Sequence, residues 1–349
     1  MKIKPIKFKN KLVGENQKCY IIAEIGSNFD GSLTKAKKLI RLAKLSGADA
    51  VKFQTFTAEN LISKSGFDEK NAFQKNWKKS VWDTYKSAEF PRKWHKILND
   101  YSKKLQIHFF TSPWDFEAVD MLNDLNPPAI KIGSGDITYN KILRYIGSKR
   151  KPVILATGAS TMKEVENAVK VIKSTGNSKI ILLHSVTQYP SVIEEANLLV
   201  LNKMKEKFKL NVGYSDHSPG SLIAIASVTL GACIIEKHFT ENPNLTGPDH
   251  PHSMDPKSFQ SMVKDIRLLQ YALGNGIKKV EKTEKETRII QRRGIWTTSA
   301  IAKGEEFTEE NVKALRPALG ISISKYDSVL GKSAKKNFHA YQPIKEKDL

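Results

Sequence analysis

The chain has 349 residues, of which 40% are apolar and 27% are charged. This mixture is typical of globular domains and excludes a disordered or collagen-like chain, and no stretch approaches the roughly 18 apolar residues of a membrane span. The net charge of +21 is spread along the whole sequence without an aromatic and basic cluster, so we expect neither nucleic acid nor a membrane as a partner. Because the basic N-terminal segment lacks the apolar core of a signal peptide, we expect a cytoplasmic protein.

Strand-like and helix-like segments alternate along most of the chain. Short apolar runs typical of strands buried on both faces occupy residues 19–26, 48–54, 107–112, 129–134, 152–158, 179–185, 211–216 and 232–238. Helical spacing of apolar residues is clearest in residues 33–47, 91–104, 161–176 and 256–274. Pro91 and Pro256 are expected to open two of these helices. Eight strand–helix repeats predict an α/β fold, a (β/α)8 TIM barrel over residues 1–275.

Two segments lie outside this repeat. Residues 55–90 form a long insertion that contains Phe73, Trp77, Trp82 and Tyr85, and after a barrel strand such a loop is expected to be a lid, a substrate wall or a packed flap.

The last part of the chain differs in composition from the barrel. Residues 276–290 are charged and are expected to form a linker. Residues 291–349 are expected to form a small domain with a turn at Lys303-Gly304 and a short helix over Thr308–Val312.

Polar residues stand at the carboxyl end of nearly every predicted strand, which is where the active sites of such barrels lie. They are Glu24, Asn28, Lys52, Gln54, Thr111, Ser112, Lys131, Ser134, Asp136, His184, Tyr189, Ser215, Asp216, His217, Glu236, Lys237 and His238. The strand bodies are apolar, so we expect these side chains to gather at one face and form an active site. Cys19 and Cys233 lie in apolar runs instead and are expected to be buried core thiols.

Lys52 and Lys131 are unusual because a lysine in a strand buried on both faces is costly unless it is paired. An ion pair with Glu24 or Asp136 would explain them structurally. A Schiff-base lysine is a second reading. Because hydroxyl residues stand at the neighbouring strand ends, we favour a third reading, a pocket for a small ligand that carries a phosphate and a carboxylate.

His217 and His238 end two neighbouring predicted strands, and acidic residues precede each of them. Two imidazoles at the active face suit a divalent metal ion with open positions for water or substrate. His250 and His252 follow in the next loop and are further candidate ligands, although we expect that loop to be flexible.

Five motifs in chain order resemble the sialic acid synthase family, that is, N-acetylneuraminate synthase and its relatives. They are IIAEIGSN (21–28), GADAVKFQ (47–54), KIGSGD (131–136), YSDHSPG (214–220) and IEKHFT (235–240). Residues 291–349 resemble the C-terminal antifreeze-like (SAF) domain of that family. The resemblance implies an enzyme that condenses phosphoenolpyruvate with N-acetylmannosamine or a related N-acylated amino sugar and water. The products would be N-acetylneuraminate, or a related nonulosonic acid, and phosphate.

The family resemblance also implies roles for individual residues. It implies that His217 and His238 hold a divalent ion, Mn or Mg, which activates the sugar aldehyde. Glu24 would stabilise positive charge at carbon 2 of phosphoenolpyruvate or orient the water. The residues implied to bind phosphoenolpyruvate are Lys52, Ser112, Lys131, Ser134, Thr187 and Ser215. Those implied to contact the sugar are Gln54, Asp136, Tyr189, Glu236, Asp249 and Arg316. Arg316 would come from the antifreeze-like domain of a second subunit, which implies a domain-swapped homodimer.

The chain departs from the family pattern at two places. Phe29 follows Asn28 where the family often has a histidine, and residues 184–190 read HSVTQYP where a cysteine-containing pattern is usual. These departures leave the sugar open among precursors of N-acetylneuraminate, legionaminate, pseudaminate and a 9-phosphate form. A Schiff-base sugar-acid aldolase and a carbohydrate-binding or nucleic-acid-binding protein are the rival hypotheses.

Overall fold

The structure is a computed structural model that describes residues 3–67, 69–70, 74–75 and 77–349. The chain divides into two compact units, Met1–Gly274 and Asn275–Leu349. Each unit has its own apolar core. Phe73, one of the aromatic residues of the predicted insertion, lies outside the described residues.

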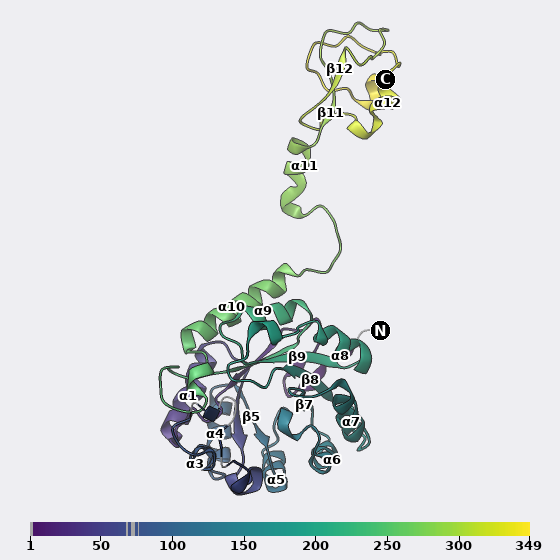
Figure 1. Cartoon of the computed structure of the whole chain (residues 1–349). Coiled ribbons are helices and arrows are strands. Elements are labelled where there is room, and N and C mark those ends of the chain that lie inside the picture. Colours follow the sequence, from purple (N-terminus) through teal and green to yellow (C-terminus); the bar gives the residue numbers. More distant parts are fainter. Residues whose placement is uncertain (1–2, 68, 71–73, 76) are drawn as a thin grey trace. The chain divides into compact units, whose positions relative to one another are not determined.

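The first unit contains an eight-stranded parallel sheet that curves into a barrel (Figure 1). Its strands are β3 (Tyr20–Glu24), β4 (Ala50–Thr55), β5 (His108–Pro113), β6 (Ile130–Ile132), β7 (Val153–Ala156), β8 (Ile180–Ser185), β9 (Asn211–Asp216) and β10 (Ile234–His238). The hydrogen-bonded order is β5-β4-β3-β10-β9-β8-β7-β6. The end strands β5 and β6 are in contact, although within the described residues no backbone ladder joins them.

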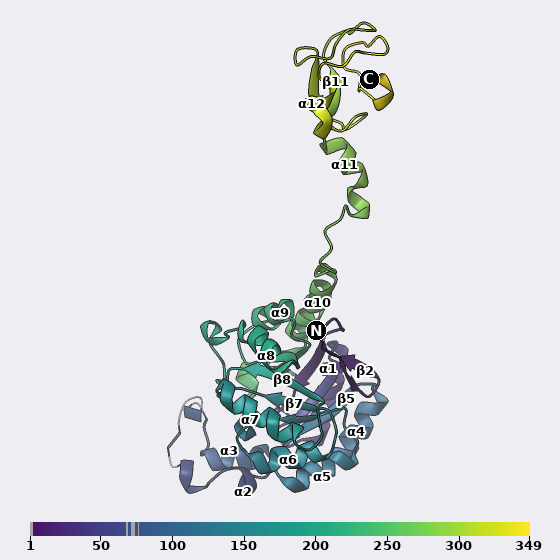
Figure 2. The same cartoon turned by 90° about the vertical axis from the view of Figure 1, so that its right-hand side faces the viewer.

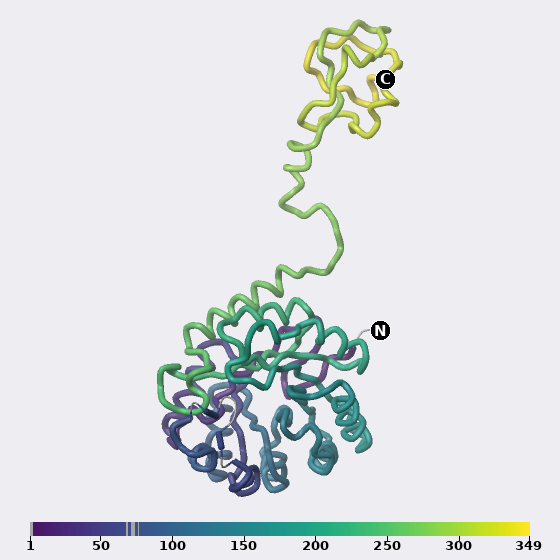
Figure 3. The backbone as a smooth tube through the Cα atoms, in the orientation of Figure 1, coloured from purple at the N-terminus to yellow at the C-terminus, as the bar shows by residue number. Residues whose placement is uncertain are grey.

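A helix follows each barrel strand, and Figure 3 traces this alternation along the chain. These helices are α1 (Leu33–Leu45), α4 (Trp94–Lys104), α5 (Phe116–Asp124), α6 (Asn140–Ser148), α7 (Met162–Lys173), α8 (Val200–Phe208), α9 (Leu222–Thr229) and α10 (Pro256–Ala272). The predicted TIM barrel is therefore confirmed. Described 3-10 helices occupy Ser65–Phe67, Ser134–Asp136, Ile193–Glu195, His250–His252, Lys282–Glu284, Ile323–Lys325 and Glu346–Asp348.

Alternation along the strands separates two apolar layers. Ile21 and Ile235 pack outward against the helices in the larger core, whereas Ile22 and Ile234 fill the inside of the barrel. The hairpin of β1 (Ile6–Phe8) and β2 (Lys11–Val13) adds Phe8 and Val13 to the inner layer. Since apolar side chains fill the lower interior of the barrel, the space for a polar pocket inside the barrel lies at the carboxyl ends of the strands.

The helix ends follow from local sequence in several places. Asp255 caps α10 by accepting hydrogen bonds from the backbone amides of residues 257 and 258, with Pro256 in the first turn as predicted. The expectation for Pro91 was wrong. Helix α4 begins at Trp94, because the residues after Pro91 form a turn in which the Trp94 amide donates to the Pro91 carbonyl.

The predicted insertion contains two short helices, α2 (Ala58–Leu61) and α3 (Val81–Ala88). Figure 2 shows them on the opposite side of the unit from β2. The ring of Tyr85 lies 5.6 Å from that of Phe56 and 5.9 Å from that of Trp77. These aromatic contacts attach the insertion to the carboxyl end of β4, where it forms a wall of the cavity described below.

The second unit is small and has its own apolar core. Its elements are α11 (Lys285–Gln291), β11 (Gly294–Thr297), β12 (Val312–Leu315) and α12 (Tyr326–Val329), with β11 and β12 antiparallel. The predicted helix over Thr308–Val312 is absent from this described segment. The amide of Asn311 closes a turn on the Thr308 carbonyl, and Val312 already begins β12.

Two further expectations concern the chain as a whole. Both cysteines are buried and free, as predicted. Among the described residues, none of the helices combines the length and the apolar character needed to cross a membrane.

Candidate active site

A cavity of ≈ 480 Å³ opens at the carboxyl ends of the barrel strands. Every barrel residue to which the family resemblance assigns a role contributes to its lining, namely Glu24, Lys52, Gln54, Ser112, Lys131, Ser134, Asp136, Thr187, Tyr189, Ser215, His217, Glu236, His238 and Asp249. The reason is the parallel sheet, because all its strands end at the same face. The other strand-end residues expected at the active site do not line the cavity, because their side chains bond to neighbouring parts of the chain; they are Asn28, Thr111, His184, Asp216 and Lys237.

Two lysines and two glutamates form a buried charge cluster in this cavity. Nζ of Lys52 lies 2.8 Å from Oε2 of Glu24 and 3.5 Å from Oε1 of Glu236. Nζ of Lys131 lies 2.9 Å from the same Glu236 oxygen. Each of the four side chains is at most 6% exposed. Of the two partners considered for these lysines, Glu24 is therefore present, and Glu236 is a second one.

Burial and mutual attraction shift the protonation equilibria of these groups in different directions. Burial raises the pKa of Glu24 and lowers that of Lys131. Burial also opposes the charge of Lys52, but the carboxylates of Glu236 and Glu24 outweigh it and raise the lysine pKa. Burial by itself would raise the pKa of Glu236, but the charges of Lys131 and Lys52 outweigh burial and hold this pKa below its usual value. Glu24 is therefore the carboxyl group of the cluster that most readily accepts a proton.

Hydroxyl groups converge over the backbone of Gly158. The Gly158 amide donates to Oγ of Ser134 at 3.0 Å. A Cβ atom at Gly158 would lie 2.1 Å from Oγ1 of Thr187, 2.7 Å from Oγ of Ser185 and 2.9 Å from Oγ of Ser134. Oγ of Ser185 is buried and has no hydrogen-bond partner among the described residues. A glycine thus makes room for three hydroxyls, one of which is free to bind a ligand.

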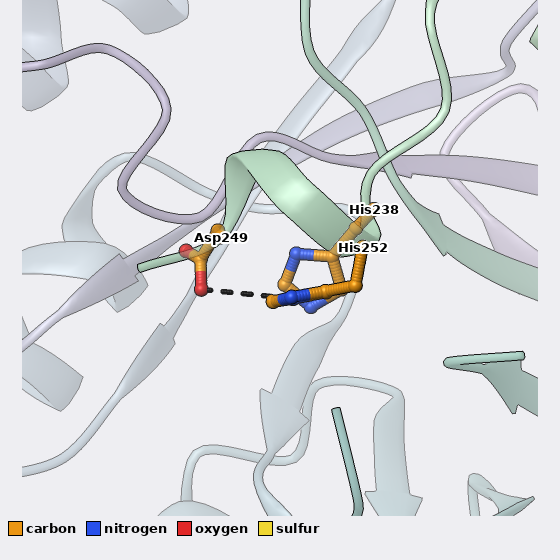
Figure 4. Close-up of side chains that lie close together, drawn as sticks. All are labelled: His238, Asp249 and His252. Atoms are coloured by element: carbon orange, nitrogen blue, oxygen red, sulfur yellow. Dashed lines mark ion pairs between the residues drawn. The ribbon is translucent and has the colours of Figure 1, made fainter. Parts of the chain in front are cut away.

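His238, Asp249 and His252 form a second cluster at the cavity (Figure 4). Each offers one ligand atom, and these atoms all lie within 4.8 Å of one another. Nδ1 of His238 is buried without a hydrogen-bond partner among the described residues. Burial lowers the pKa of both imidazoles, that of His238 well below its usual value. Two neutral imidazoles and a carboxylate are a donor set that fits a divalent transition metal.

The local fold explains why Asp249 and His252 meet. The residues from His250 to His252 form a 3-10 helix that Asp249 precedes as N-cap. Because such a helix has three residues per turn, positions three apart point in the same direction. Oδ2 of Asp249 also accepts hydrogen bonds from the amide and the hydroxyl of Ser27, both at 2.8 Å. The carboxylate is therefore held beside the imidazole of His252.

His250 points away from the other two histidine side chains. It is fully buried, with Nδ1 2.6 Å from Oγ1 of Thr240 and Nε2 3.2 Å from both carboxylate oxygens of Asp30. These contacts anchor the loop between β10 and α10. The flexibility expected for this loop stays a prediction.

His217 completes the histidine side of the cavity. Its ring centroid lies 5.7 Å from that of His238 and 4.3 Å from that of Tyr189. Nδ1 lies 2.7 Å from the carbonyl oxygen of Val186, and burial lowers the pKa of this imidazole to about 4. A neutral ring whose Nδ1 donates to a carbonyl presents Nε2 as an acceptor for a ligand.

The amino-acid sequence matches the NeuB family over residues 39–278 and the SAF domain over residues 292–349. The chain belongs to the NeuB family. It is therefore an enzyme of the sialic acid synthase type, and the resemblance drawn from its motifs is confirmed.

Individual relatives of this NeuB chain cover nearly its whole length. It is 42% identical over 336 residues to N,N'-diacetyllegionaminic acid synthase of Campylobacter jejuni, a match that covers 95% of this chain and 100% of the relative. It is 37% identical over 330 residues to pseudaminic acid synthase of Helicobacter pylori, with 94% and 97% covered. A solved structure of N-acetylneuraminic acid synthetase from Leptospira borgpetersenii superimposes with a TM-score of 0.73 at 34% identity, covering 81% of this chain and 95% of that chain.

Two residues of the hydroxyl cluster were not singled out from the sequence of this NeuB chain. Ser185 lines the cavity and lies in the HSVTQYP segment, whose departure from the family pattern was the available signal. Gly158 carried no motif signal, because only folding brings its strand beside that of Ser185. His252 was named but not favoured. The spacing Asp249-x-x-His252 around Pro251 was the available signal, since it places both side chains on one face of a 3-10 turn. Arg316 directly follows β12 in the second unit, and its role in a sugar site stays a prediction.

The insertion contributes most of the apolar lining of the cavity. The apolar lining residues of the insertion and of the segment after β5 are Phe56, Leu61, Ile62, Trp77, Ala88 and Trp114. Nε1 of Trp114 is buried without a hydrogen-bond partner among the described residues. Asp136 lies nearby, and burial raises its pKa to about 6. This part of the cavity therefore offers apolar surface with a few polar groups.

Proposed function

We propose that this chain condenses phosphoenolpyruvate with N-acetylmannosamine or a related N-acylated amino sugar, forming a nonulosonic acid and releasing phosphate. The observation that carries the proposal is that one cavity holds two chemically different groups of side chains. Lys52 and Lys131 belong to one group, and the neutral histidines His217 and His238 form the other. Such a site suits a ligand with two anionic groups next to one with a polarisable carbonyl oxygen.

Phosphoenolpyruvate would bind at the lysines and the surrounding hydroxyls. Nζ of Lys52 donates to Oγ of Ser112 at 3.3 Å, and Ser215 donates to Glu236 at 3.4 Å. The remaining proposed contacts are Ser134 and Thr187, with Ser185 added by the structure. With all four charges present, the lysines and glutamates neutralise one another. Protonation of Glu24, whose pKa burial raises, would leave net positive charge for the anion.

A divalent ion, Mn or Mg, would bind on the histidine side. His217 and His238 are the ligands implied by the resemblance, and the geometry adds Asp249 and His252 as candidates. Imidazole nitrogen favours Mn over Mg, which prefers oxygen ligands. When bound, the ion supplies Lewis acidity at the sugar aldehyde. The buried orphan nitrogen of His238 is the feature of the chain that fits this ion best.

The reaction balances without a further co-reactant. Carbon 3 of phosphoenolpyruvate forms a bond to the aldehyde carbon, whose oxygen becomes a hydroxyl. Water adds at carbon 2, and the adduct expels phosphate, which leaves the 2-keto acid. Glu24 is proposed to stabilise the positive charge at carbon 2 or to orient this water. Nε2 of Gln54 donates to Oε1 of Glu24 at 2.9 Å, which fixes the carboxyl group.

The sugar would extend from the histidines toward the apolar outer wall. Its proposed polar contacts are Gln54, Asp136, Tyr189, Glu236, Asp249 and Arg316. The supply of Arg316 by a second subunit, and with it the domain-swapped homodimer, belongs to this proposal, as does a cytoplasmic location. The names of the relatives support two of the alternatives that the sequence left open, N,N'-diacetyllegionaminic acid and pseudaminic acid.

Phosphate release tests the proposal. The purified chain is incubated with phosphoenolpyruvate, Mn²⁺ and one aldose at a time. The panel contains N-acetylmannosamine, its 6-phosphate and the di-N-acetylated aldoses that would yield legionaminic and pseudaminic acids. We expect phosphate release that requires one of these sugars and stops with a chelator. If none of them causes release, the proposed function is wrong.

A Schiff-base aldolase is the rival enzyme hypothesis. It is favoured by the lowered pKa of Lys131 but opposed by the ion pair of this lysine with Glu236. Borohydride treatment in the presence of a keto acid distinguishes the two. Covalent trapping on Lys131 or Lys52 supports the aldolase, and its absence together with chelator sensitivity supports the condensation.

A further inference from the structure

Lys237 and Asp216 form an ion pair on the outer face of the barrel wall. Nζ of Lys237 lies 2.8 Å from Oδ2 of Asp216, and the side chains are 1% and 0% exposed. Along β10, Ile235 points outward into the core beneath the helices, and Lys237 shares its direction two residues later. Tyr214 and Asp216 are related in the same way on β9. The pair is therefore buried behind the cavity wall and does not line the cavity.

A buried ion pair of this kind gives little net stability. Moving two charges out of water costs about as much as their attraction returns, and apolar residues in the same place are often equally stable. The neighbouring outward positions along both strands are apolar. Stability alone therefore does not explain a lysine and an aspartate at these two positions.

The register of the strands connects this pair to the active site. Lys237 lies opposite Asp216, and the preceding opposed residues, Glu236 and Ser215, point into the cavity. In the chain, His238 directly follows Lys237, and His217 directly follows Asp216. Each histidine is thus the next residue after one member of the pair.

Further hydrogen bonds connect Ser218, two residues after Asp216, to both members of the pair. Lys237 donates to the carbonyl oxygen of Ser218, and the amide and hydroxyl of Ser218 donate to Oδ1 of Asp216 at 2.9 Å and 2.6 Å. His217 lies between Asp216, which forms an ion pair with Lys237, and Ser218, whose carbonyl oxygen accepts a hydrogen bond from Lys237. Its backbone is therefore fixed relative to β10, which carries His238.

We propose that Lys237 and Asp216 are a positioning pair that sets the separation of His217 and His238 and so shapes the divalent-ion site. This inference rests on the proposed function, because it gives the pair a purpose in that site. It assigns no chemical step to either residue. A loss of the pair should alter ion binding more than it alters folding.

The double variant K237M/D216N tests the inference in the full-length chain. It removes both charges together, so that no unpaired charge is left buried, and the asparagine keeps an oxygen for Ser218. We expect the melting temperature to change by no more than about 4 °C. The dissociation constant for Mn²⁺, measured by electron paramagnetic resonance of the free ion, should rise at least about tenfold. The same affinity as in the unaltered chain would overturn the inference.

The control is R267M/D49N at the opposite end of the strands, in which Lys11, 37% exposed, also loses its partner Asp49. Nη2 of Arg267 lies 3.0 Å from Oδ2 of Asp49, and the side chains are 18% and 10% exposed. This variant should bind Mn²⁺ like the unaltered chain. An equal loss in both variants would show that any damaged ion pair weakens the site, which also overturns the inference.

A milder variant covers the case in which K237M/D216N does not fold. S218A removes one hydrogen bond to Asp216 and leaves the ion pair in place. We expect Mn²⁺ binding at least about threefold weaker, and unchanged binding would refute the positioning role. If the unaltered chain binds Mn²⁺ but no sugar of the panel causes phosphate release, only the proposed function fails. If the unaltered chain binds no Mn²⁺, the positioning inference fails instead.

Discussion

Asp249 and His252 face each other across one turn of a 3-10 helix, with Oδ1 of the aspartate 3.8 Å from Nε2 of the histidine. The contact is too long for a hydrogen bond, and Nε2 of His252 has none among the described residues. Together with Nδ1 of His238, this arrangement leaves an unused donor set at the mouth of the barrel. An ion that these atoms share would bring them closer together.

Metal binding distinguishes the two candidate ligand sets. We expect H252Q to weaken Mn²⁺ binding at least about tenfold, because one of three nitrogen or oxygen ligands is lost. Titration calorimetry on the full chain measures this. H108Q is the control, since His108 lies at the other end of the barrel and contacts Tyr20 and Asn10. If H252Q binds normally while H217Q does not, His217 and His238 are the ligands without His252.

Removal of the Glu236 charge should reveal the buried cationic pocket. In E236Q, Lys131 loses its carboxylate partner at 2.9 Å, so an uncompensated charge stays buried. We expect the free energy of unfolding to fall by about 3 to 5 kcal/mol in urea titrations. Inorganic phosphate should restore more stability to E236Q than to the unaltered chain, because the anion replaces the lost charge.

The control for this experiment is E241Q. Glu241 pairs with Lys35 and Lys38 near the surface, where the Glu241, Lys35 and Lys38 side chains are 21%, 17% and 53% exposed. Solvent reaches these partly exposed pairs and screens them, so we expect a loss below about 1 kcal/mol. Equal losses in E236Q and E241Q would contradict the buried charge cluster.

Ser185 should matter for the ligand and not for the fold. Its buried hydroxyl has no partner among the described residues, so S185A removes an unsatisfied group and should not lower stability. If this hydroxyl donates to an anionic substrate, the KM for phosphoenolpyruvate should rise about tenfold. Steady-state phosphate release gives this value once the sugar is identified.

A second buried hydroxyl provides the comparison. Ser102 in α4 likewise has no hydrogen-bond partner for its hydroxyl among the described residues, but it does not line the cavity. We expect S102A to match S185A in thermal stability and to leave the KM unchanged. A normal KM in S185A would remove this residue from the proposed phosphoenolpyruvate site.

Acid should destabilise the protein through buried neutral histidines. Burial lowers the pKa of His95 to about 4, and its ring contacts Oγ1 of Thr55 at 2.7 Å and the Arg92 carbonyl at 2.8 Å. Between pH 7 and pH 5 the unfolded chain takes up a proton at this residue and the folded chain does not. The stability that His95 contributes is therefore present at pH 7 and lost as the pH falls.

The expected size of this effect is roughly 2 kcal/mol per histidine between pH 7 and pH 5. Urea unfolding at both pH values should show a smaller difference for H95Q than for the unaltered chain. H339Q, altered at an exposed residue of the second unit, serves as the control. If H95Q and H339Q show the same pH difference, the neutral state of His95 is wrong.

Much of the fold could be predicted because periodicity is a local property. The first four residues of β8, Ile180 to Leu183, are apolar, and no arrangement other than a strand buried on both faces suits them as well. Predictions from local sequence failed where neighbouring residues formed a turn instead. Proline is a suitable first residue for a helix, but the residues after Pro91 form a turn, and α4 begins only at Trp94. Thr308 begins a turn, because Val312 pairs with Thr297 in the second sheet.

The sequence alone determined the kind of chemistry available, since it put lysines, hydroxyls and histidines at strand ends, and parallel strands must end together. Only the tertiary structure decided which of them interact. Glu236 pairs with both lysines because the barrel curvature brings β10 close to β4 and β6. Ser185 meets Gly158 because β8 and β7 are hydrogen-bonded neighbours in register. The side chain of His252 lies near that of His238 because the loop after β10 forms the 3-10 helix His250–His252. Such contacts depend on direction and distance across the barrel, which spacing along a chain does not record.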